Sequence, residues 1–432
     1  MAFTRKPAAA PAWRGWRRPA AILISMTAFM ATGLVAGPVT TAYAAAGPCA
    51  LPRTDSHHSL GVDSWDASYP KPRGALDAAM LFLSFPDAPP MATPAELTAD
   101  HFPVTTDFFD RVSYGRFHLR PHPDRRWTRM PEASTAYGIQ RDWSTEQRTD
   151  YLRDAIAAAD PHVDFSRYDF VYLVADPDAP GVNSDATKVV NLDEPVEADG
   201  RKLSRVVTVF EQTPPDRNVL AHETGHIFDL PDLYQRPEDG KGDWDTYVGD
   251  WDLMGSQFGL APDPFGWDKW KLGWLDKRNV TCVPAGPGGY DATLGPLGGA
   301  RLGGADDRRL AVVRTGATEA LAMEVREPKG VDAGACRSGV LLYWVRSDRP
   351  STEGPVEVVD GHPRTGGCPS EAVSPELADA PLGVGESYRT ARGGGVRVQV
   401  TGRDPDGSWN LRIHRGPLRD TTAAAPELPV VR

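Results

Sequence analysis

Apolar and polar stretches alternate along the chain up to Trp274, in a pattern that predicts strands and helices in turn. Helices are predicted at residues 106–112, where Phe108, Phe109 and Val112 share one face, and at residues 144–159. Three short apolar runs ended by turn-forming or polar residues are typical of buried strands: 79–85, 169–174 and 206–210. This alternation predicts a domain of the α/β or α+β class.

The pattern changes after Trp274, where helical periodicity fades. Short β-like runs separated by Gly, Pro and Asp turns follow: 310–313, 320–325, 340–345, 356–359, 396–400 and 409–413. Residues 404–407, Asp-Pro-Asp-Gly, are typical of a hairpin turn. We therefore predict an all-β domain, a sandwich, at residues 278–415, and a disordered tail at 416–432.

The first 44 residues have the features of an export signal. The pair Arg17-Arg18 precedes an apolar run at residues 20–35, and Ala42-Tyr43-Ala44 is a suitable cleavage site. The alternative is a membrane anchor, but this run is short for one and ends at Gly37-Pro38. We expect residues 1–44 to be removed on secretion, leaving a first domain at 45–277 and no membrane association.

Charge and cysteine content narrow the possible partners and the compartment. The net charge of −11 repels phosphate backbones, so nucleic acid is not an expected partner. Four cysteines in an exported chain predict two disulfides, with three possible pairings. We favour Cys336–Cys368, because both lie in the C-terminal region, which leaves Cys49–Cys282. Alternatively, Cys49 is a free thiolate that masks a metal.

The segment His222-Glu223-Thr224-Gly225-His226 carries the clearest candidate chemistry. Histidines four positions apart lie on one face of a helix, so both imidazoles can reach one ion. Zinc suits such ligands, and a catalytic zinc site takes three protein ligands and a water. Glu223 is adjacent to the first ligand, so its carboxylate can lie beside that water and act as a general base.

Asp232 is the candidate third ligand. If the helix continued, its rise of about 1.5 Å per residue would carry Asp232 roughly 15 Å past His222. Pro231 disfavours helix at Leu230 and cannot donate a helical hydrogen bond, so the helix must end before it. The chain can then fold back and present Asp232 to the metal.

Together these residues resemble the long zinc signature of the metzincin peptidases, H-E-x-x-H-x-x-G-x-x-H/D. Met254, in the segment 251–256, resembles their Met-turn, the methionine under the metal. Within that clan the chain is similar to the immune inhibitor A-type metallopeptidases, over roughly residues 75–360. The segments that carry this similarity are 108–115, 222–234, 251–255 and 271–274. The resemblance implies a metzincin-like catalytic domain of the α+β class and a secreted endopeptidase.

One position departs from that signature. Its glycine, which makes the bend after the helix, is replaced by Asp229. Asp is among the few residues that tolerate a positive φ, so we expect the bend to survive. If Asp232 does not bind the metal, Asp229 or a residue of the acidic loop would take its place.

Other residues give weaker signals. Tyr234 and Tyr247 are both candidates to stabilise an oxyanion. The acidic loop at residues 238–250 is a weakly supported calcium site, and a solvated loop is the simpler interpretation. Residues 267–274 are predicted to form an amphipathic helix that belongs to the core.

We therefore expect a secreted, monomeric zinc endopeptidase acting on proteins or peptides. His222, His226 and Asp232 would hold one zinc ion, and Glu223 would be the catalytic base. The alternative is a secreted binding protein with a vestigial or masked zinc site, in which the β-rich domain carries the function. An intact Glu223 argues against that alternative, because a retired site has no use for the base.

Overall fold

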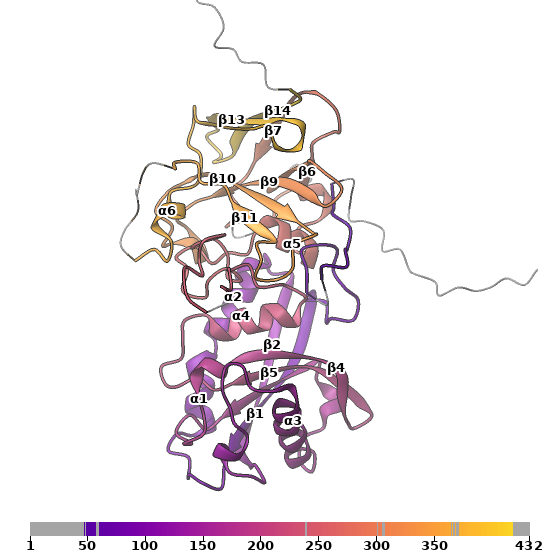
Figure 1. Cartoon of the computed structure of the whole chain (residues 1–432), viewed down its shortest axis with the longest axis vertical. Helices are drawn as coiled ribbons and strands as arrows, with labels where there is room; N and C mark the ends of the chain where they lie inside the picture. The colour runs from indigo at the N-terminus through magenta and orange to yellow at the C-terminus, as the bar shows by residue number, and fades with distance from the viewer. Residues whose placement is uncertain are drawn as a thin grey trace, which may run out of the picture. The chain divides into compact units, whose positions relative to one another are not determined.

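The three predicted strands of the first domain lie in one sheet. The computed structural model describes residues 47, 49–57, 60–237, 240–299, 301–304, 307–363, 365, 368 and 371–417. The first sheet has the order β2-β1-β3-β5-β4, and β4 alone runs antiparallel to its neighbour. Its strands are β1 (Gly74–Ser84), β2 (Phe117–Arg129), β3 (Phe170–Ala175), β4 (Lys188–Ala198) and β5 (Arg201–Val209) (Figure 1).

The two strands that the sequence pattern did not predict, β2 and β4, are the two edges of this sheet. β2 contains Pro121 and Pro123, and β4 contains Pro195 beside a register shift. An edge strand tolerates proline and charged residues because its outer side forms no ladder hydrogen bonds. The apolar signal used for prediction is therefore absent from both.

Helices cover both faces of the first sheet. α3 begins after the capping box of Ser144 and Gln147 and packs Leu152 and Ile156 against one face. α2 and α4 pack against the other face, which includes Met80. The helices are α1 (Pro94–His101), α2 (Val104–Val112), α3 (Thr145–Ala159), α4 (Val219–Ile227), α5 (Gly266–Leu272) and α6 (Pro375–Ala378). Short 3₁₀ turns lie at Ser134–Ala136, Phe165–Arg167, Ser184–Ala186, Lys277–Asn279, Gly330–Asp332 and Arg392–Gly394.

The C-terminal region is rich in β-structure, as predicted, and forms two sheets. One has the order β11-β10-β9-β8-β6 and the other β12-β13-β14-β7. All six predicted runs are strands, and the predicted hairpin turn joins β13 to β14, with Gly407 at φ +92°. The strands are β6 (Val280–Cys282), β7 (Gly288–Leu294), β8 (Leu310–Arg314), β9 (Glu319–Arg326), β10 (Gly339–Arg346), β11 (Val356–Val358), β12 (Ser387–Thr390), β13 (Val396–Arg403) and β14 (Trp409–Arg415).

Both faces of the five-stranded C-terminal sheet are buried. In β9, Leu321 and Met323 face the four-stranded sheet, whereas Ala320 and Ala322 belong to the cluster that also contains α4. The two C-terminal sheets thus share a core, as in a sandwich. The other face of the five-stranded sheet packs against the region that carries the predicted zinc motif, and the described residues form one compact unit.

Both favoured disulfide pairs are present. Cys336 is bonded to Cys368 and Cys49 to Cys282, so Cys49 is not a free metal-masking thiol. The pairs are compatible with a secreted protein. No helix among the described residues is long and apolar enough to cross a membrane. The predicted signal peptide and residues 418–432 of the predicted tail lie outside the described residues.

Candidate metal and active site

The helix that carries the two histidines ends where the sequence predicts. α4 stops at Ile227, and Asp229 adopts φ +72°, the left-handed conformation expected for the glycine of the signature. The Leu230 N–H donates back to the Gly225 carbonyl at 3.2 Å, which closes the bend. The chain reverses here and returns Asp232 toward the helix.

Three ligand atoms converge beside α4. His222 Nε2 lies 3.3 Å and His226 Nε2 3.1 Å from Asp232 Oδ1. All three atoms are within 4.8 Å of one another, and no other group of three such side chains was found among the described residues. No such group lies in the described part of the acidic loop, where calcium was the weaker alternative to a solvated loop, and Glu238 and Asp239 lie outside the described residues.

Backbone carbonyls orient both imidazoles. His222 Nδ1 lies 2.9 Å from the Leu253 carbonyl oxygen, and His226 Nδ1 lies 2.7 Å from that of Leu230. A carbonyl only accepts, so each Nδ1 is the donor, which leaves each Nε2 lone pair directed at the shared point. Burial would raise the pKa of Asp232, but the two histidines outweigh it and lower that pKa, so the carboxylate is ionised.

The aspartate that replaces the signature glycine forms a buried ion pair. Asp229 Oδ2 lies 2.9 Å from Lys271 Nζ of α5 and accepts the Asp66 N–H at 2.9 Å. Burial raises the pKa of Asp229 to about 6, although Lys271 opposes the shift. Asp229 therefore ties the bend to α5 and to the N-terminal segment, and it is not one of the three converging residues.

Glu223 lies on the same helix, buried and beside the ligand group. Its Oε2 accepts the N–H of Val189, at the start of the edge strand β4. Burial raises the pKa of Glu223, and the neighbouring imidazoles of His222 and His226 lower it. The carboxylate thus adjoins the candidate metal site without being one of its three ligands.

Met254 lies directly against α4. A Cβ atom on Gly225 would stand 2.6 Å from the Met254 sulfur, so only glycine fits at that position of the helix. The Met254 carbonyl accepts the N–H of Leu233, next to Asp232, at 2.9 Å. The methionine thus contacts both the helix and the returning chain.

Sequence reasoning missed the carboxylates beneath this turn. Asp252, at φ +117°, accepts the N–H groups of Met254 and Phe265, both at 2.6 Å. Asp268 of α5 is also buried. Burial raises the pKa of both carboxyls; the Asp268 charge raises that of Asp252 further, whereas Lys271 and a hydrogen bond with Asp252 partly oppose the rise at Asp268. The helix α5 was expected to be amphipathic, but all its residues are buried, including the paired Lys271.

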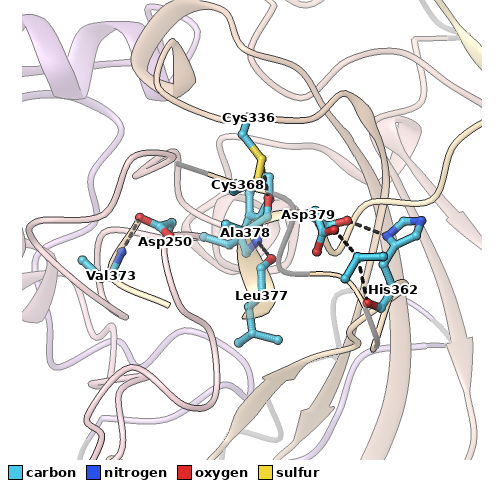
Figure 2. The surroundings of a disulfide bond; sticks show 10 residues. Asp250, Cys336, His362, Cys368, Val373, Leu377, Ala378 and Asp379 are labelled. Atoms are coloured by element: carbon cyan, nitrogen blue, oxygen red, sulfur yellow. Dashed lines mark hydrogen bonds between the residues drawn. A yellow bond between two sulfur atoms is a disulfide. The ribbon is translucent and has the colours of Figure 1, made fainter. Parts of the chain in front are cut away.

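The Cys336–Cys368 bond anchors a C-terminal segment that packs against the same turn (Figure 2). The Val373 N–H donates to Asp250 Oδ1 at 3.2 Å. Trp251, which lies three residues before Met254, donates its Nε1–H to the Leu377 carbonyl at 2.8 Å. No feature of the sequence linked these residues, because they lie more than a hundred positions apart.

The ligand group opens onto a cleft of about 630 Å³ that also holds Glu223 and Tyr234. The Tyr234 ring stacks on the His222 ring, with the two ring centroids 6.4 Å apart and an interplanar angle of 19°. Burial, and then the nearby Asp232 and Glu223 carboxylates, raise the pKa of Tyr234, so its hydroxyl is a proton donor. Tyr247 does not line this cleft, which favours Tyr234 as the oxyanion candidate.

No protein-family profile matches this chain, and no curated protein sequence matches it significantly. We therefore infer the function from the residues of the site.

Proposed function

We propose that the chain is a secreted zinc-dependent endopeptidase of the metzincin type. The observation that carries the proposal is the convergence of His222 Nε2, His226 Nε2 and Asp232 Oδ1 beside the buried Glu223, in an open cleft. Two nitrogens and one carboxylate oxygen are a donor set that zinc prefers in hydrolytic sites.

The three side chains fit a cation. Asp232 Oδ1 is buried and makes no hydrogen bond apart from its contacts with His222 Nε2 and His226 Nε2. An ionised buried carboxylate is costly unless it is paired or binds a metal. The Nδ1 contacts already fix the histidine tautomers in which Nε2 is free to bind. A bound zinc ion would supply Lewis acidity, polarising the scissile carbonyl and making water beside it more acidic.

We assign proton transfer and oxyanion stabilisation to side chains of the protein. Glu223 takes a proton from the attacking water and transfers it to the leaving amine, as a general base and then a general acid. Its burial favours that role, because desolvation raises the carboxylate's affinity for a proton. The Tyr234 hydroxyl donates to the oxyanion of the tetrahedral intermediate.

Cleavage of unfolded casein by the purified exported chain tests this function, with Glu223→Gln as the matched variant. The proposal expects fragments from the wild type and none from the variant. A folded wild type that holds one zinc ion and leaves casein intact would refute it. Equal cleavage by both proteins would remove Glu223 from the mechanism.

A further inference from the structure

One wall of the cleft carries three cationic side chains: Arg141, Lys188 and Arg236. All three lie close enough to Asp142 to lower the pKa of that carboxyl, Arg236 most strongly. Arg236 Nη2 lies 2.8 Å from Asp142 Oδ1, and both side chains are about half exposed or more. Asp142 is thus a carboxylate that all three cations share, while Glu223 also acts on Lys188 and Asp232 on Arg236.

The neighbouring charges do not cancel this excess. Asp185 lies 3.9 Å from Arg141, a distance at which an exposed pair contributes little. Arg148 adds a fourth positive charge near Lys188 and Asp142. The chain as a whole is acidic, with a net charge of −11, so a cationic wall inside the cleft is a local exception.

These cations are held near the reacting groups. Lys188 precedes Val189, whose N–H reaches Glu223, and the Lys188 ammonium donates to the Arg141 carbonyl. Arg236 lies two residues after Tyr234, whose ring stacks on His222. The wall therefore adjoins the place where a scissile bond would lie.

Acidic side chains line another part of the cleft. Glu211 accepts the N–H of Asp216 at 3.0 Å, and Asp216 accepts from Gln257 at 3.2 Å. Burial raises the pKa of Glu211, and the nearby Asp216 and Glu223 carboxylates raise it further. The cleft is thus polarised, with a cationic wall and a separate acidic stretch.

We infer that the wall of Arg141, Lys188 and Arg236 selects a substrate with an aspartate or glutamate side chain close to the scissile bond. This inference rests on the proposed peptidase function and names its preferred substrate. Asp142 and Asp185 are the exposed carboxylates beside these cations, and Arg148 adds a further positive charge, so a substrate carboxylate would find cationic partners here. Guanidinium groups bind carboxylates through paired hydrogen bonds.

The test begins with a library of peptides digested by the full exported chain, with cleavage sites read by mass spectrometry. We expect Asp and Glu to be enriched within two residues of the cut. From the best-cleaved sequence, a matched pair of peptides carrying Glu or Gln at that position is then compared by kcat/KM. We expect the Glu peptide to be preferred about tenfold at low salt, and less at high salt because exposed charges are screened.

Charge-reversal variants test whether the cationic wall causes the preference for the Glu peptide. Arg236→Glu should abolish or invert the ratio of the two kcat/KM values, whereas Arg412→Glu, which removes an exposed ion pair with Asp291 on the β-rich part, should leave it unchanged. Efficient cleavage with no preference for Glu, or a preference that survives Arg236→Glu, would overturn the inference.

A binding measurement separates this inference from the proposed function. Fluorescence anisotropy of the labelled Glu and Gln peptides is measured on the Glu223→Gln chain, with and without Arg236→Glu. Tighter binding of the Glu peptide that is lost in Arg236→Glu supports the inference even if no peptide is cleaved. Equal binding of both peptides contradicts it, whatever the fate of the peptidase proposal.

Discussion

Replacing Asp229 by glycine introduces the residue that the metzincin signature has at the equivalent place, yet we predict that it destabilises this protein. The change relieves a positive φ at a non-glycine residue, worth about 1–2 kcal/mol. It also leaves the buried Lys271 ammonium without its carboxylate partner, which costs about 3–5 kcal/mol. Lys271 still donates to the carbonyls of Gly61 and Asp229, so the lower part of that range applies. We expect a net loss of about 2 kcal/mol.

A double-mutant cycle by urea unfolding at pH 7.5, followed by tryptophan fluorescence, measures this directly. At that pH the Asp229 carboxyl, whose pKa is about 6, is ionised. Asp229→Gly and Lys271→Met should each lower the free energy of unfolding, and the double variant should lose clearly less than their sum. The reasoning is refuted if Asp229→Gly is as stable as the wild type, or if the coupling is below about 0.5 kcal/mol.

Three further predictions concern stability and turnover. Burial lowers the pKa of His101 from 6.5 to about 4. Between these two pH values the unfolded chain binds a proton at His101 that the folded chain does not bind, so the free energy of unfolding falls as the pH falls from about 6.5 to about 4. His101→Met should therefore reduce the stability lost between pH 7 and 5 by about 2 kcal/mol in urea unfolding, and an unchanged loss would contradict this. Replacing both Cys336 and Cys368 by serine opens a 32-residue loop and should cost about 3–4 kcal/mol by the same assay; a loss below 1 kcal/mol would argue against an anchoring role. Tyr234→Phe should lower kcat about 100-fold, whereas Tyr247→Phe should not, and equal effects would remove Tyr234 as the oxyanion donor.

The residues proposed to act on the metal were predictable because their signals are local. The spacing of His222 and His226 requires only helical geometry, and Pro231 ends the helix whatever surrounds it. The positive φ of Asp229 follows from the same bend. The apolar runs that became central strands were equally readable, because burial on both faces demands apolar side chains.

What the sequence did not reveal depends on contacts between distant segments. β4 was missed because an edge strand needs no apolar pattern, yet it carries Val189, which reaches Glu223, and Lys188 of the cleft wall. The ion pair of Asp229 with Lys271 was also missed, because charged residues in a short segment are expected to face solvent. Only the packing of α5 on the bend turns them into buried partners.

Zinc content and casein cleavage, measured together in the wild type, Glu223→Gln and Asp232→Ala, decide whether the three ligands and the base have the roles proposed. We predict one zinc ion per chain in the wild type and in Glu223→Gln, with cleavage in the wild type alone. We also predict weakened zinc binding in Asp232→Ala, because one of three converging ligand atoms is lost. Full zinc content and full activity in Asp232→Ala, or loss of zinc from Glu223→Gln, would contradict the assigned roles.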